Sequence, residues 1–293
     1  MRLSFVVPVY NERESVAELV GGILEHSRPH ECQIVLVDDG STDGSGAAIE
    51  ELAGQHGNVV AIRFARNRGK SAALEAGIRR ADGDVLFTMD SDLQDEPREI
   101  PQFLEKLAEG HDLVCGWKAV RHDPGHKTVP SFFYNRMVAA VFGLGIHDVN
   151  CGYKAMRIEV AKSLHLYGDR HRLVPVIASA QGFRVSELAV QHHARRHGKS
   201  KFGPERFSRG AIDLVTLWFL VNYRWRPAHF FGLWGTFLIA LGLGVGTFAL
   251  ARPHPEAGVI IGVGLGIGGA VFVGLGLVAE MIVSIVAEPK KGD

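Results

Sequence analysis

Two carboxylates stand two positions apart at Asp90 and Asp92, directly after the largely apolar run 85–89. Side chains at positions i and i+2 that leave a strand for a loop can converge on one hard divalent cation, and Gln94 offers a third oxygen. Mg²⁺ or Mn²⁺ typically binds through one or two carboxylates together with phosphates of a substrate. The pair therefore predicts a metal site for a phosphorylated substrate, although two acids in a turn also occur by chance.

Three earlier apolar runs are also followed by polar or glycine-rich segments, at 8–12, 38–45 and 66–70. A single acidic residue at such a place is explained as a helix N-cap, and we expect that role for Asp43 before Gly44. Four polar segments in succession exceed what capping requires. They predict a ligand site built from several strand ends.

Alternating strands and helices are needed to position these segments, and the sequence has that pattern. Five short runs, rich in β-branched residues and nearly continuous in hydrophobicity, predict strands that are buried on both faces. These runs are 3–8, 33–37, 59–64, 85–89 and 113–116. Helical patterns separate them at 15–26, 44–55, 70–81 and 97–109. The alternation predicts an α/β body around a mostly parallel sheet, and such sheets bind ligands beyond the carboxyl ends of their strands.

The composition excludes several classes of protein. The chain has 293 residues, with 32 basic and 32 acidic side chains and a formal net charge of zero. This neutral balance argues against nucleic acid as a partner, which requires a basic excess. Cys32, Cys115 and Cys151 form no CxxC motif, so neither a disulfide scaffold nor a zinc ribbon is expected. The first apolar run is short and ends at Asn11, which predicts that there is no N-terminal signal peptide.

Two long segments near the C-terminus, residues 228–251 and 257–279, carry no formal charge. About 20 apolar residues suffice to cross a hydrocarbon core of about 30 Å. We therefore predict two transmembrane helices, at about 228–251 and 257–283, within a hairpin that occupies 228–287. Buried core helices of a soluble protein are the alternative. The glycine-rich stretch 262–276 permits close helix packing, which is compatible with a homo-oligomer.

Basic residues gather immediately before the first of these segments. Between residues 195 and 226, arginines and lysines clearly outnumber acidic side chains. By the positive-inside rule, the N-terminal body and both termini lie in the cytoplasm, in a multi-pass protein of the plasma or inner membrane. The mixture of apolar, aromatic and charged residues at 206–227 predicts an amphipathic interfacial helix, with a final core helix as the alternative. The expected parts are a catalytic body at 1–205, this helix, the membrane hairpin and a cytoplasmic tail at 288–293.

Four motifs, taken together, resemble the family 2 glycosyltransferases, whose catalytic domain has the GT-A fold. They are VPVYNE at 7–12, VDDGSTDGS at 37–45, RNRGKSAAL at 66–74 and DSDLQDEP at 90–97. Two later segments narrow the resemblance, DVNCGYKAMR at 148–157 and RRHGKSKF at 195–202. They are similar to the branch that contains dolichol-phosphate mannose synthase and polyprenyl-phosphate glycosyltransferases, whose bacterial members often end in two membrane helices. The combination of DSDLQ with RxxGxSK is specific, whereas VDDGS occurs widely in family 2.

The resemblance implies a nucleotide-sugar site at the first four motifs. Its residues would be Pro8, Tyr10, Glu12, Asp39, Lys70, Asp90, Ser91, Asp92 and Gln94. Asp39 would accept a hydrogen bond from the base or ribose of a UDP- or GDP-linked donor. Asp90, Asp92 and Gln94 would bind Mg²⁺ or Mn²⁺ and, through it, the donor diphosphate.

The resemblance also implies a cationic site for an acceptor phosphate. Its residues would be Lys118, Arg121, Arg136, Arg195, Ser200 and Lys201. The residues expected to serve catalysis are Asp90, Asp92, Arg195 and Lys201. For each basic residue, a solvated surface charge is the alternative.

The resemblance, together with the membrane segments, implies a membrane-anchored, inverting transferase that moves one sugar from a nucleotide-sugar to undecaprenyl or dolichyl phosphate. The metal would neutralise charge on the departing nucleoside diphosphate, while arginine and lysine would orient the acceptor. Because the second pKa of a phosphate monoester is about 6, the acceptor is largely ionised at neutral pH and needs no strong general base. Asp148 is the best candidate base if one exists, and a structural hydrogen-bonding role is equally compatible with its position.

Other functions are compatible with parts of the sequence. A family 2 enzyme could act on a different lipid, protein or saccharide acceptor. A non-catalytic membrane scaffold could retain the fold, but it would have no physical need for the paired carboxylates. His193 and His197 have the spacing of a zinc-ligand pair, but they adjoin arginines in the segment that the resemblance assigns to phosphate.

Overall fold

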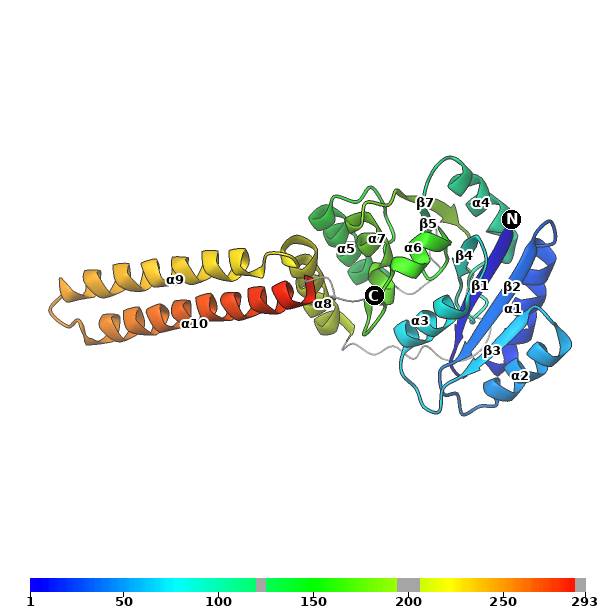
Figure 1. The fold of residues 1–293 in the computed structure, drawn as a ribbon, viewed down its shortest axis with the longest axis horizontal. Coiled ribbons are helices and arrows are strands. Elements are labelled where there is room, and N and C mark those ends of the chain that lie inside the picture. Colours follow the sequence, from blue (N-terminus) through cyan, green and yellow to red (C-terminus); the bar gives the residue numbers. More distant parts are fainter. Residues whose placement is uncertain (120–124, 194–205, 288–293) are drawn as a thin grey trace. The chain divides into compact units, whose positions relative to one another are not determined.

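The computed structural model describes residues 1–119, 125–193 and 206–287 of the chain. The chain divides into two compact units, 1–214 and 215–293. The first contains the sheet and the second contains two long apolar helices (Figure 1). Helix α8, Arg206–Tyr223, spans the boundary between the units, and its assignment to a membrane interface stays a prediction.

One sheet of seven strands forms the centre of the first unit, in the order β3-β2-β1-β4-β6-β5-β7 (Figure 1). The strands are β1 Arg2–Val9, β2 Glu31–Asp38, β3 Val59–Arg63, β4 Val85–Thr88, β5 Leu113–Lys118, β6 Lys154–Arg157 and β7 Val185–Val190. Strand β6 pairs antiparallel with both of its neighbours, and the other pairs are parallel. The mostly parallel sheet confirms the predicted fold class. Its carboxyl edge collects the polar segments that follow β1, β2 and β4.

Helices cover both faces of the sheet and give three layers. They are α1 Arg13–His26, α2 Ser45–Gln55, α3 Lys70–Arg80, α4 Ile100–Ala108, α6 Ile158–Ser163 and α7 Val174–Ala180. Short 3₁₀ turns lie at Pro97–Glu99 and Arg170–Leu173, and the same unit contains α5, Gly125–Phe142. On one face, Val16, Ile49 and Phe103 from α1, α2 and α4 pack against the strands. On the other face, Leu74 from α3 and Val160 from α6 do the same. Strand β1 contributes to both clusters, which explains its nearly continuous hydrophobicity.

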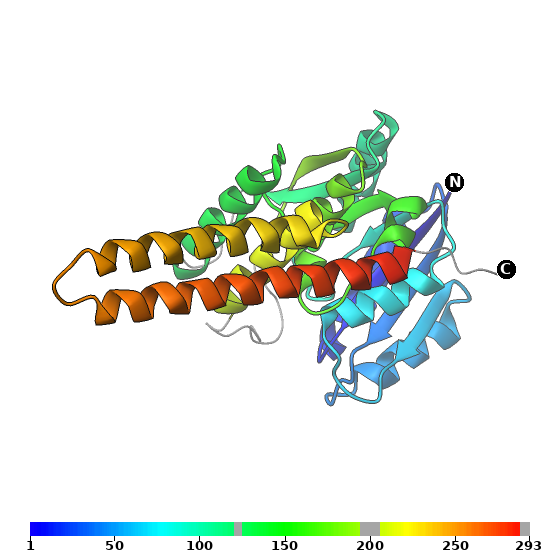
Figure 2. The same cartoon turned by 60° about the vertical axis from the view of Figure 1, so that its left-hand side comes forward.

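The second unit contains a hairpin of α9, Pro227–Leu250, and α10, Glu256–Ala287, which lie side by side (Figure 2). A Cβ at Gly242 would lie 2.5 Å from the carbonyl oxygen of Gly262, so glycine permits this close approach of the helices. Both helices are long and apolar enough to cross a membrane, and only 11% of the apolar stretch of each is buried. Core helices bury their apolar side chains, so this exposure argues for membrane spans.

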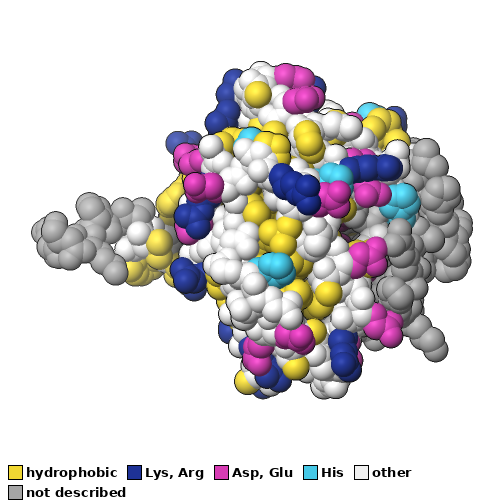
Figure 3. Space-filling view, turned by 90° about the vertical axis from the view of Figure 1, so that its right-hand side faces the viewer, with side chains coloured by type: hydrophobic (Ala, Val, Ile, Leu, Met, Phe, Trp, Pro, Cys, Tyr) yellow, Lys and Arg dark blue, Asp and Glu magenta, His cyan; other side chains and the backbone are white. Residues whose placement is uncertain are grey.

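The surface of the first unit carries mixed charge. On the face in Figure 3, basic and acidic side chains lie interspersed over the described residues. Some charges of this unit pair locally, as Lys106 of α4 and Glu109 just after that helix do at 2.6 Å. Exposed pairs of this kind add little to stability, so the charges that matter for function are sought at the carboxyl edge of the sheet.

Candidate active site

A cleft with a volume of about 330 Å³ opens at the carboxyl edge of the sheet. Its walls come from the segments after β1, β2 and β4 and from the start of α3. They comprise Pro8, Val9, Tyr10, Glu12, Asp39, Asn67, Gly69, Lys70, Asp90, Ser91 and Asp92. The structure thus brings together every residue predicted for the nucleotide-sugar site except Gln94, and their roles stay predictions.

Side chains of the segment after β2 hold the segment after β1 in place. The N–H groups of Asn11 and Glu12 donate to the hydroxyls of Ser41 and Ser45, both at 2.9 Å. Asn11 has a φ of 53°, a left-handed conformation that asparagine tolerates. Asp43 accepts the N–H of Ser45 at 2.9 Å, but it stands one position before the N-cap of α2. The N-cap expected at Asp43 is therefore wrong by one residue, although its carboxylate still satisfies the first turn.

Asp39 joins the segment after β2 to the loop before α3. Its two carboxylate oxygens accept the N–H groups of Arg68 at 2.7 Å and of Gly69 at 3.0 Å. Burial raises the pKa of Asp39, although these hydrogen bonds favour the charged form. The neighbouring Gly40 has a φ of +72°, and a Cβ there would lie 2.4 Å from the carbonyl carbon of Arg66. Only glycine fits at this crossing of two loops.

Lys70, the first residue of α3, directs its ammonium to Oδ1 of Asp90, and the two side chains form an ion pair. Their side chains are 28% and 31% exposed, so both remain accessible from the cleft. Burial alone would raise the pKa of Asp90, but the Lys70 charge outweighs burial and holds that pKa well below its ordinary value. Asp90 is therefore a charged carboxylate throughout the neutral pH range.

The chain returns to this carboxylate just before β6. A Cβ at Gly152 would lie 2.5 Å from Oδ2 of Asp90, so the glycine leaves room for the carboxylate. Oγ1 of Thr88 donates to the carbonyl oxygen of Gly152 at 2.7 Å, which fastens the segment to the end of β4. Asp90 is thus paired with Lys70 at Oδ1 and has room beside Gly152 only because that residue has no side chain.

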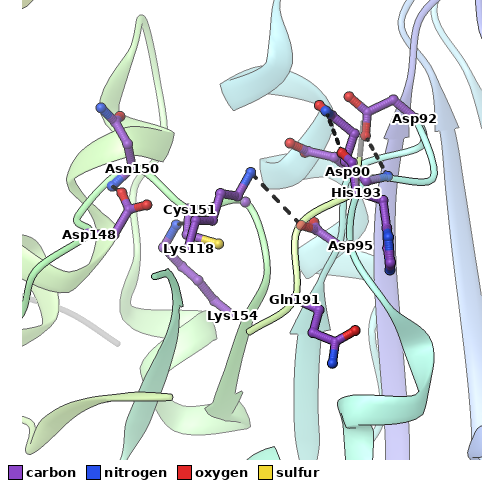
Figure 4. A network of polar contacts seen from close by, with 12 residues as sticks. Asp90, Asp92, Asp95, Lys118, Asp148, Asn150, Cys151, Lys154, Gln191 and His193 are labelled. Atoms are coloured by element: carbon purple, nitrogen blue, oxygen red, sulfur yellow. Dashed lines mark hydrogen bonds and ion pairs between the residues drawn. The ribbon is translucent and has the colours of Figure 1, made fainter. Parts of the chain in front are cut away.

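Asp92 lies in the turn that follows β4 (Figure 4). The N–H of Gln94 donates to Oδ1 of Asp92 at 3.3 Å. The side-chain Nε2 of Gln94 donates in turn to the carbonyl oxygen of His193 at 3.0 Å. Gln94 therefore ties the turn to the segment after β7, and its role as a third metal ligand stays a prediction.

Asp90 and Asp92 are two of the carboxylates that line the cleft. Among the described residues, no three His, Cys, Asp or Glu side chains form a complete metal site. His193 contacts Oε2 of Glu96 through Nε2 at 2.8 Å, and His197 lies outside the described residues. The carboxylates of Asp90, which lies beside Gly152, and Asp92 are hard oxygen donors. Two such donors suit Mg²⁺ or Mn²⁺, and phosphates and water would complete the coordination shell of the ion. The donor set therefore fits the predicted metal.

Lys118 ends β5 and points toward Asp95 (Figure 4). Its Nζ lies 4.0 Å from Oδ1 of Asp95, and the two side chains are 18% and 2% exposed. Burial disfavours the ammonium, but Asp95 outweighs it and raises the pKa of Lys118 above its ordinary value. Neither oxygen of Asp95 has a hydrogen-bond partner, so its charge is compensated by the Lys118 ammonium.

The remaining residues predicted for an acceptor phosphate are placed less fully. Arg136 is exposed on α5. The others lie outside the described residues, namely Arg121, Arg195, Ser200 and Lys201. Their proposed contacts with phosphate stay predictions.

Asp148, the candidate general base, is 2% exposed. Its Oδ1 accepts hydrogen bonds from Nδ2 of Asn135 and from the N–H of Asn150, both at 3.1 Å. These bonds fix the loop that leads to Gly152. They favour the structural alternative for Asp148.

Two residues beside the cleft were not expected from the sequence. His171 contacts Oγ of Ser71 through Nδ1 at 3.0 Å. Burial, aided by the Lys70 charge, lowers the pKa of His171 well below its ordinary value, so the ring is neutral. Lys154 is 3% exposed and donates to the carbonyl oxygen of Cys151. Lys154 falls within the DVNCGYKAMR segment, which was a usable signal, whereas His171 stands outside every motif.

Comparison with known proteins gives a family and two groups of relatives. The family model for glycosyl transferase family 2 matches residues 4–164. A dodecaprenyl-phosphate galacturonate synthase from Rhizobium johnstonii is 38% identical over 250 residues, which cover 83% of this chain and 74% of that protein. An undecaprenyl-phosphate 4-deoxy-4-formamido-L-arabinose transferase from Pseudomonas fluorescens is 36% identical over 217 residues, covering 73% of this chain and 64% of the relative. This chain thus spans less than two thirds of the second relative.

Solved structures with the same fold are more distant in sequence. Glucosyl-3-phosphoglycerate synthase from Mycobacterium tuberculosis, in complex with Mn²⁺, UDP and phosphoglyceric acid, has a TM-score of 0.59 and 18% identity. The match covers 74% of this chain and 78% of that one. Mannosyl-3-phosphoglycerate synthase from Rubrobacter xylanophilus has a TM-score of 0.59 and 17% identity, over 75% and 74% of the two chains. At these identities the likeness concerns the fold alone.

Proposed function

The chain belongs to glycosyl transferase family 2, and from that premise we propose that it transfers one sugar from a nucleotide-sugar to a polyprenyl phosphate at a membrane. The observation that carries the proposal is the presence, in one chain, of an acidic strand-end cleft and of two exposed apolar helices. The two relatives described above, which are named for transfer to dodecaprenyl and undecaprenyl phosphate, support it.

The donor nucleotide would lie along the cleft, with its base near Tyr10 and Asp39 and its diphosphate near Lys70. Asp39 already holds two backbone N–H groups, so its carboxylate is fixed as an acceptor for an N–H or O–H of the nucleoside. The start of α3 adds the anion preference of a helix N-terminus to the Lys70 charge.

Asp90 and Asp92 would hold Mg²⁺ or Mn²⁺ in the donor complex. When bound, the metal would neutralise charge that develops on the departing nucleoside diphosphate. Asp90 is suited to this role because it stays ionised at neutral pH and because Gly152 leaves room for its carboxylate. Asp92 is positioned by the N–H of Gln94 in the same turn.

The acceptor phosphate would approach from the side of Lys118, with Arg121, Arg136, Arg195, Ser200 and Lys201 as further proposed contacts. A phosphate oxygen would attack the anomeric carbon opposite the leaving diphosphate, which inverts the configuration at that carbon. The attacking oxygen carries no proton at neutral pH, because the second pKa of a phosphate monoester is about 6. Asp148 then serves the loop before Gly152 through its bonds to Asn135 and Asn150.

We propose that α9 and α10 cross the plasma or inner membrane, with the catalytic unit and both termini in the cytoplasm. A polyprenyl phosphate keeps its chain in the bilayer and its phosphate at the surface. An enzyme anchored by its own hairpin meets this acceptor without extracting it from the membrane. The predicted interfacial helix at 206–227 would lie at that surface.

The test is sugar transfer by the purified full-length chain in detergent or nanodiscs. A panel of UDP- and GDP-sugars is offered with Mg²⁺ or Mn²⁺ and with undecaprenyl or dolichyl phosphate, and glycolipid is detected by mass spectrometry. Product is expected with a phosphate acceptor and not with the corresponding free alcohol. Transfer only to the alcohol, to a protein or to a saccharide would support a family 2 enzyme with a different acceptor. No transfer to any acceptor would support a non-catalytic membrane scaffold.

A matched pair of variants tests the metal assignment in the same assay. Asp92→Asn should lower metal-dependent transfer by roughly 10² or more, because one of two hard anionic ligands is lost. Asp82→Asn serves as the control, since the side chain of Asp82 is 46% exposed and its carboxylate pairs with the exposed Arg2 at 3.1 Å. Full activity in Asp92→Asn would refute the assignment.

A further inference from the structure

Lys70 and the predicted metal compete for the same carboxylate. We propose that Lys70 occupies Asp90 in the donor-free enzyme and leaves it when a nucleoside diphosphate binds, so that nucleotide and divalent cation bind cooperatively. This inference rests on the proposed metal and donor sites. Beyond those sites, it proposes that the binding of the nucleotide and the binding of the metal are coupled, and that Lys70 produces the coupling.

The carboxylate of Asp90 lies beside Gly152, where a Cβ would be 2.5 Å from Oδ2 and 2.8 Å from Oδ1. Its Oδ1 contacts the Lys70 ammonium. A cation that approaches Asp90 from the cleft therefore meets a carboxylate that already carries a positive partner. Like charges at one carboxylate repel strongly at this partly buried site.

Lys70 can leave without disrupting the fold. Its side chain is 28% exposed and lies along the wall of the cleft, as does that of Asp90. The backbone of Lys70 stays fixed as the first residue of α3, so only side-chain torsions need to change. A diphosphate beside the helix N-terminus provides a new anionic partner within the same cleft.

The neighbouring basic groups do not take over this role. Lys118 is matched with the buried Asp95 at 4.0 Å. His171 is held by Oγ of Ser71 and is neutral. Lys154 is buried and donates to a backbone carbonyl. Among the residues that line the cleft, Lys70 is the basic one.

The consequence is a thermodynamic coupling. Metal alone must displace Lys70 without offering it another partner, and binds weakly. Nucleotide draws Lys70 to its phosphates and frees Oδ1 of Asp90 for the metal. By linkage, each ligand strengthens the binding of the other by the same factor.

The experiment measures Mn²⁺ binding by electron paramagnetic resonance of free Mn²⁺, using the full-length protein in detergent. The probes are Mn²⁺ alone and Mn²⁺ with saturating UDP, with GDP as a second arm. For the wild type we expect one of the nucleotides to tighten Mn²⁺ binding by roughly 10-fold or more, within the usual range of coupling. In Lys70→Met, Mn²⁺ alone should bind about 10-fold tighter than in the wild type, and the nucleotide effect should shrink by about the same factor, to the part that direct contact of the phosphates with Mn²⁺ supplies.

Three controls make the result specific. Lys106→Met removes a surface lysine that pairs with Glu109, and should leave Mn²⁺ binding unchanged. Lys70→Arg keeps the positive charge and should keep the coupling. Mn²⁺ should raise the Tm of Lys70→Met more than that of the wild type, because the variant leaves Asp90 without its ammonium partner. This last measurement also reports whether the variant folds.

Unchanged or weaker Mn²⁺ binding in a folded Lys70→Met variant would overturn the inference. If glycolipid still forms in the transfer assay, that outcome leaves the proposed function intact. If the wild type binds no Mn²⁺ even with UDP or GDP, the inference fails together with the metal assignment. Glycolipid formation in the presence of a chelator would then identify a metal-independent transferase.

Discussion

Gly152 stands against the carboxylate on which both the metal and Lys70 are proposed to act, so Gly152→Ala is an informative change. The new Cβ would lie 2.5 Å from Oδ2 of Asp90, whereas ordinary contact begins at 3.4 Å. The backbone at Gly152 is held by Thr88 at 2.7 Å, so the carboxylate is the part that must yield. It must retreat by about 0.9 Å, and a misplacement of about 1 Å typically costs roughly 10²-fold in rate.

We therefore expect Gly152→Ala to lower sugar transfer by roughly 10²-fold, which corresponds to about 2.7 kcal/mol of transition-state stabilisation. The overpacked contact should also lower the free energy of unfolding by about 1–3 kcal/mol. The assay is the initial rate of glycolipid formation at saturating metal, paired with a denaturant unfolding curve of the same preparation. Gly145→Ala is the matched control, because a Cβ at Gly145 meets nothing within 4 Å.

One result would refute the reasoning directly. A folded Gly152→Ala variant with wild-type rate and wild-type Mn²⁺ affinity would mean that the position of Asp90 is unimportant for transfer. A loss of rate that is matched in Gly145→Ala would instead trace the effect to backbone stiffness. Only a loss of rate that is confined to Gly152→Ala supports the inferred fit of the Asp90 carboxylate beside Gly152.

Three further changes test other parts of the structure. Burial, with the charges of Asp95 and Glu96, raises the pKa of Glu99 to about 7. The folded protein therefore binds this proton more tightly than the unfolded chain does. As the pH rises from 5 to 8, the free energy of unfolding of the wild type should fall by about 2 kcal/mol relative to Glu99→Gln, and the difference should stay constant above pH 8. Parallel pH profiles of the two proteins in denaturant melts would contradict this. Asp148→Asn should keep transfer within about 10-fold of the wild type, because no general base is needed for a phosphate acceptor; a loss of 10³-fold or more would make Asp148 the base. Gly242→Leu should destabilise the hairpin in detergent melts, since its Cβ would lie 2.5 Å from the carbonyl oxygen of Gly262, while Gly244→Leu, with nothing within 4 Å, should melt like the wild type.

The strands that carry the cleft could be predicted because they obey one simple pattern. β1, β2 and β4 are buried on both faces, so their hydrophobicity is nearly continuous and each ends where a polar motif begins. Strand β6 lacks that signal, since it has four residues and begins with the buried Lys154. Strand β7 forms an edge of the sheet and is only partly buried, so its run of apolar residues is interrupted. The first five strands were therefore predictable and the last two were not.

The candidate site divides in the same way. Residues that follow parallel strands must meet at one edge of the sheet, so Asp39, Asp90 and Asp92 could be grouped from sequence order alone. Gly152 lies beside Asp90 and His171 contacts Ser71, but both residues come from later parts of the chain, and no spacing rule connects them with the motifs around the cleft. The contacts between side chains could not be predicted from the sequence either, because tertiary neighbours determine each rotamer. The ion pairs of Lys70 with Asp90 and of Lys118 with Asp95 are two such contacts.

These two ion pairs differ in a way that bears on the reaction. Lys70 and Asp90 are 28% and 31% exposed, so solvent and ligands reach both charges. Lys118 and Asp95 are 18% and 2% exposed, and both oxygens of Asp95 lack hydrogen bonds. Removing one partner of such a buried pair leaves an uncompensated charge, at a cost of about 3–5 kcal/mol. The Lys70 pair is therefore suited to exchange when the donor binds. The Lys118 pair must persist, so an acceptor phosphate can approach Lys118 only as an additional ligand of an ammonium that Asp95 continues to hold.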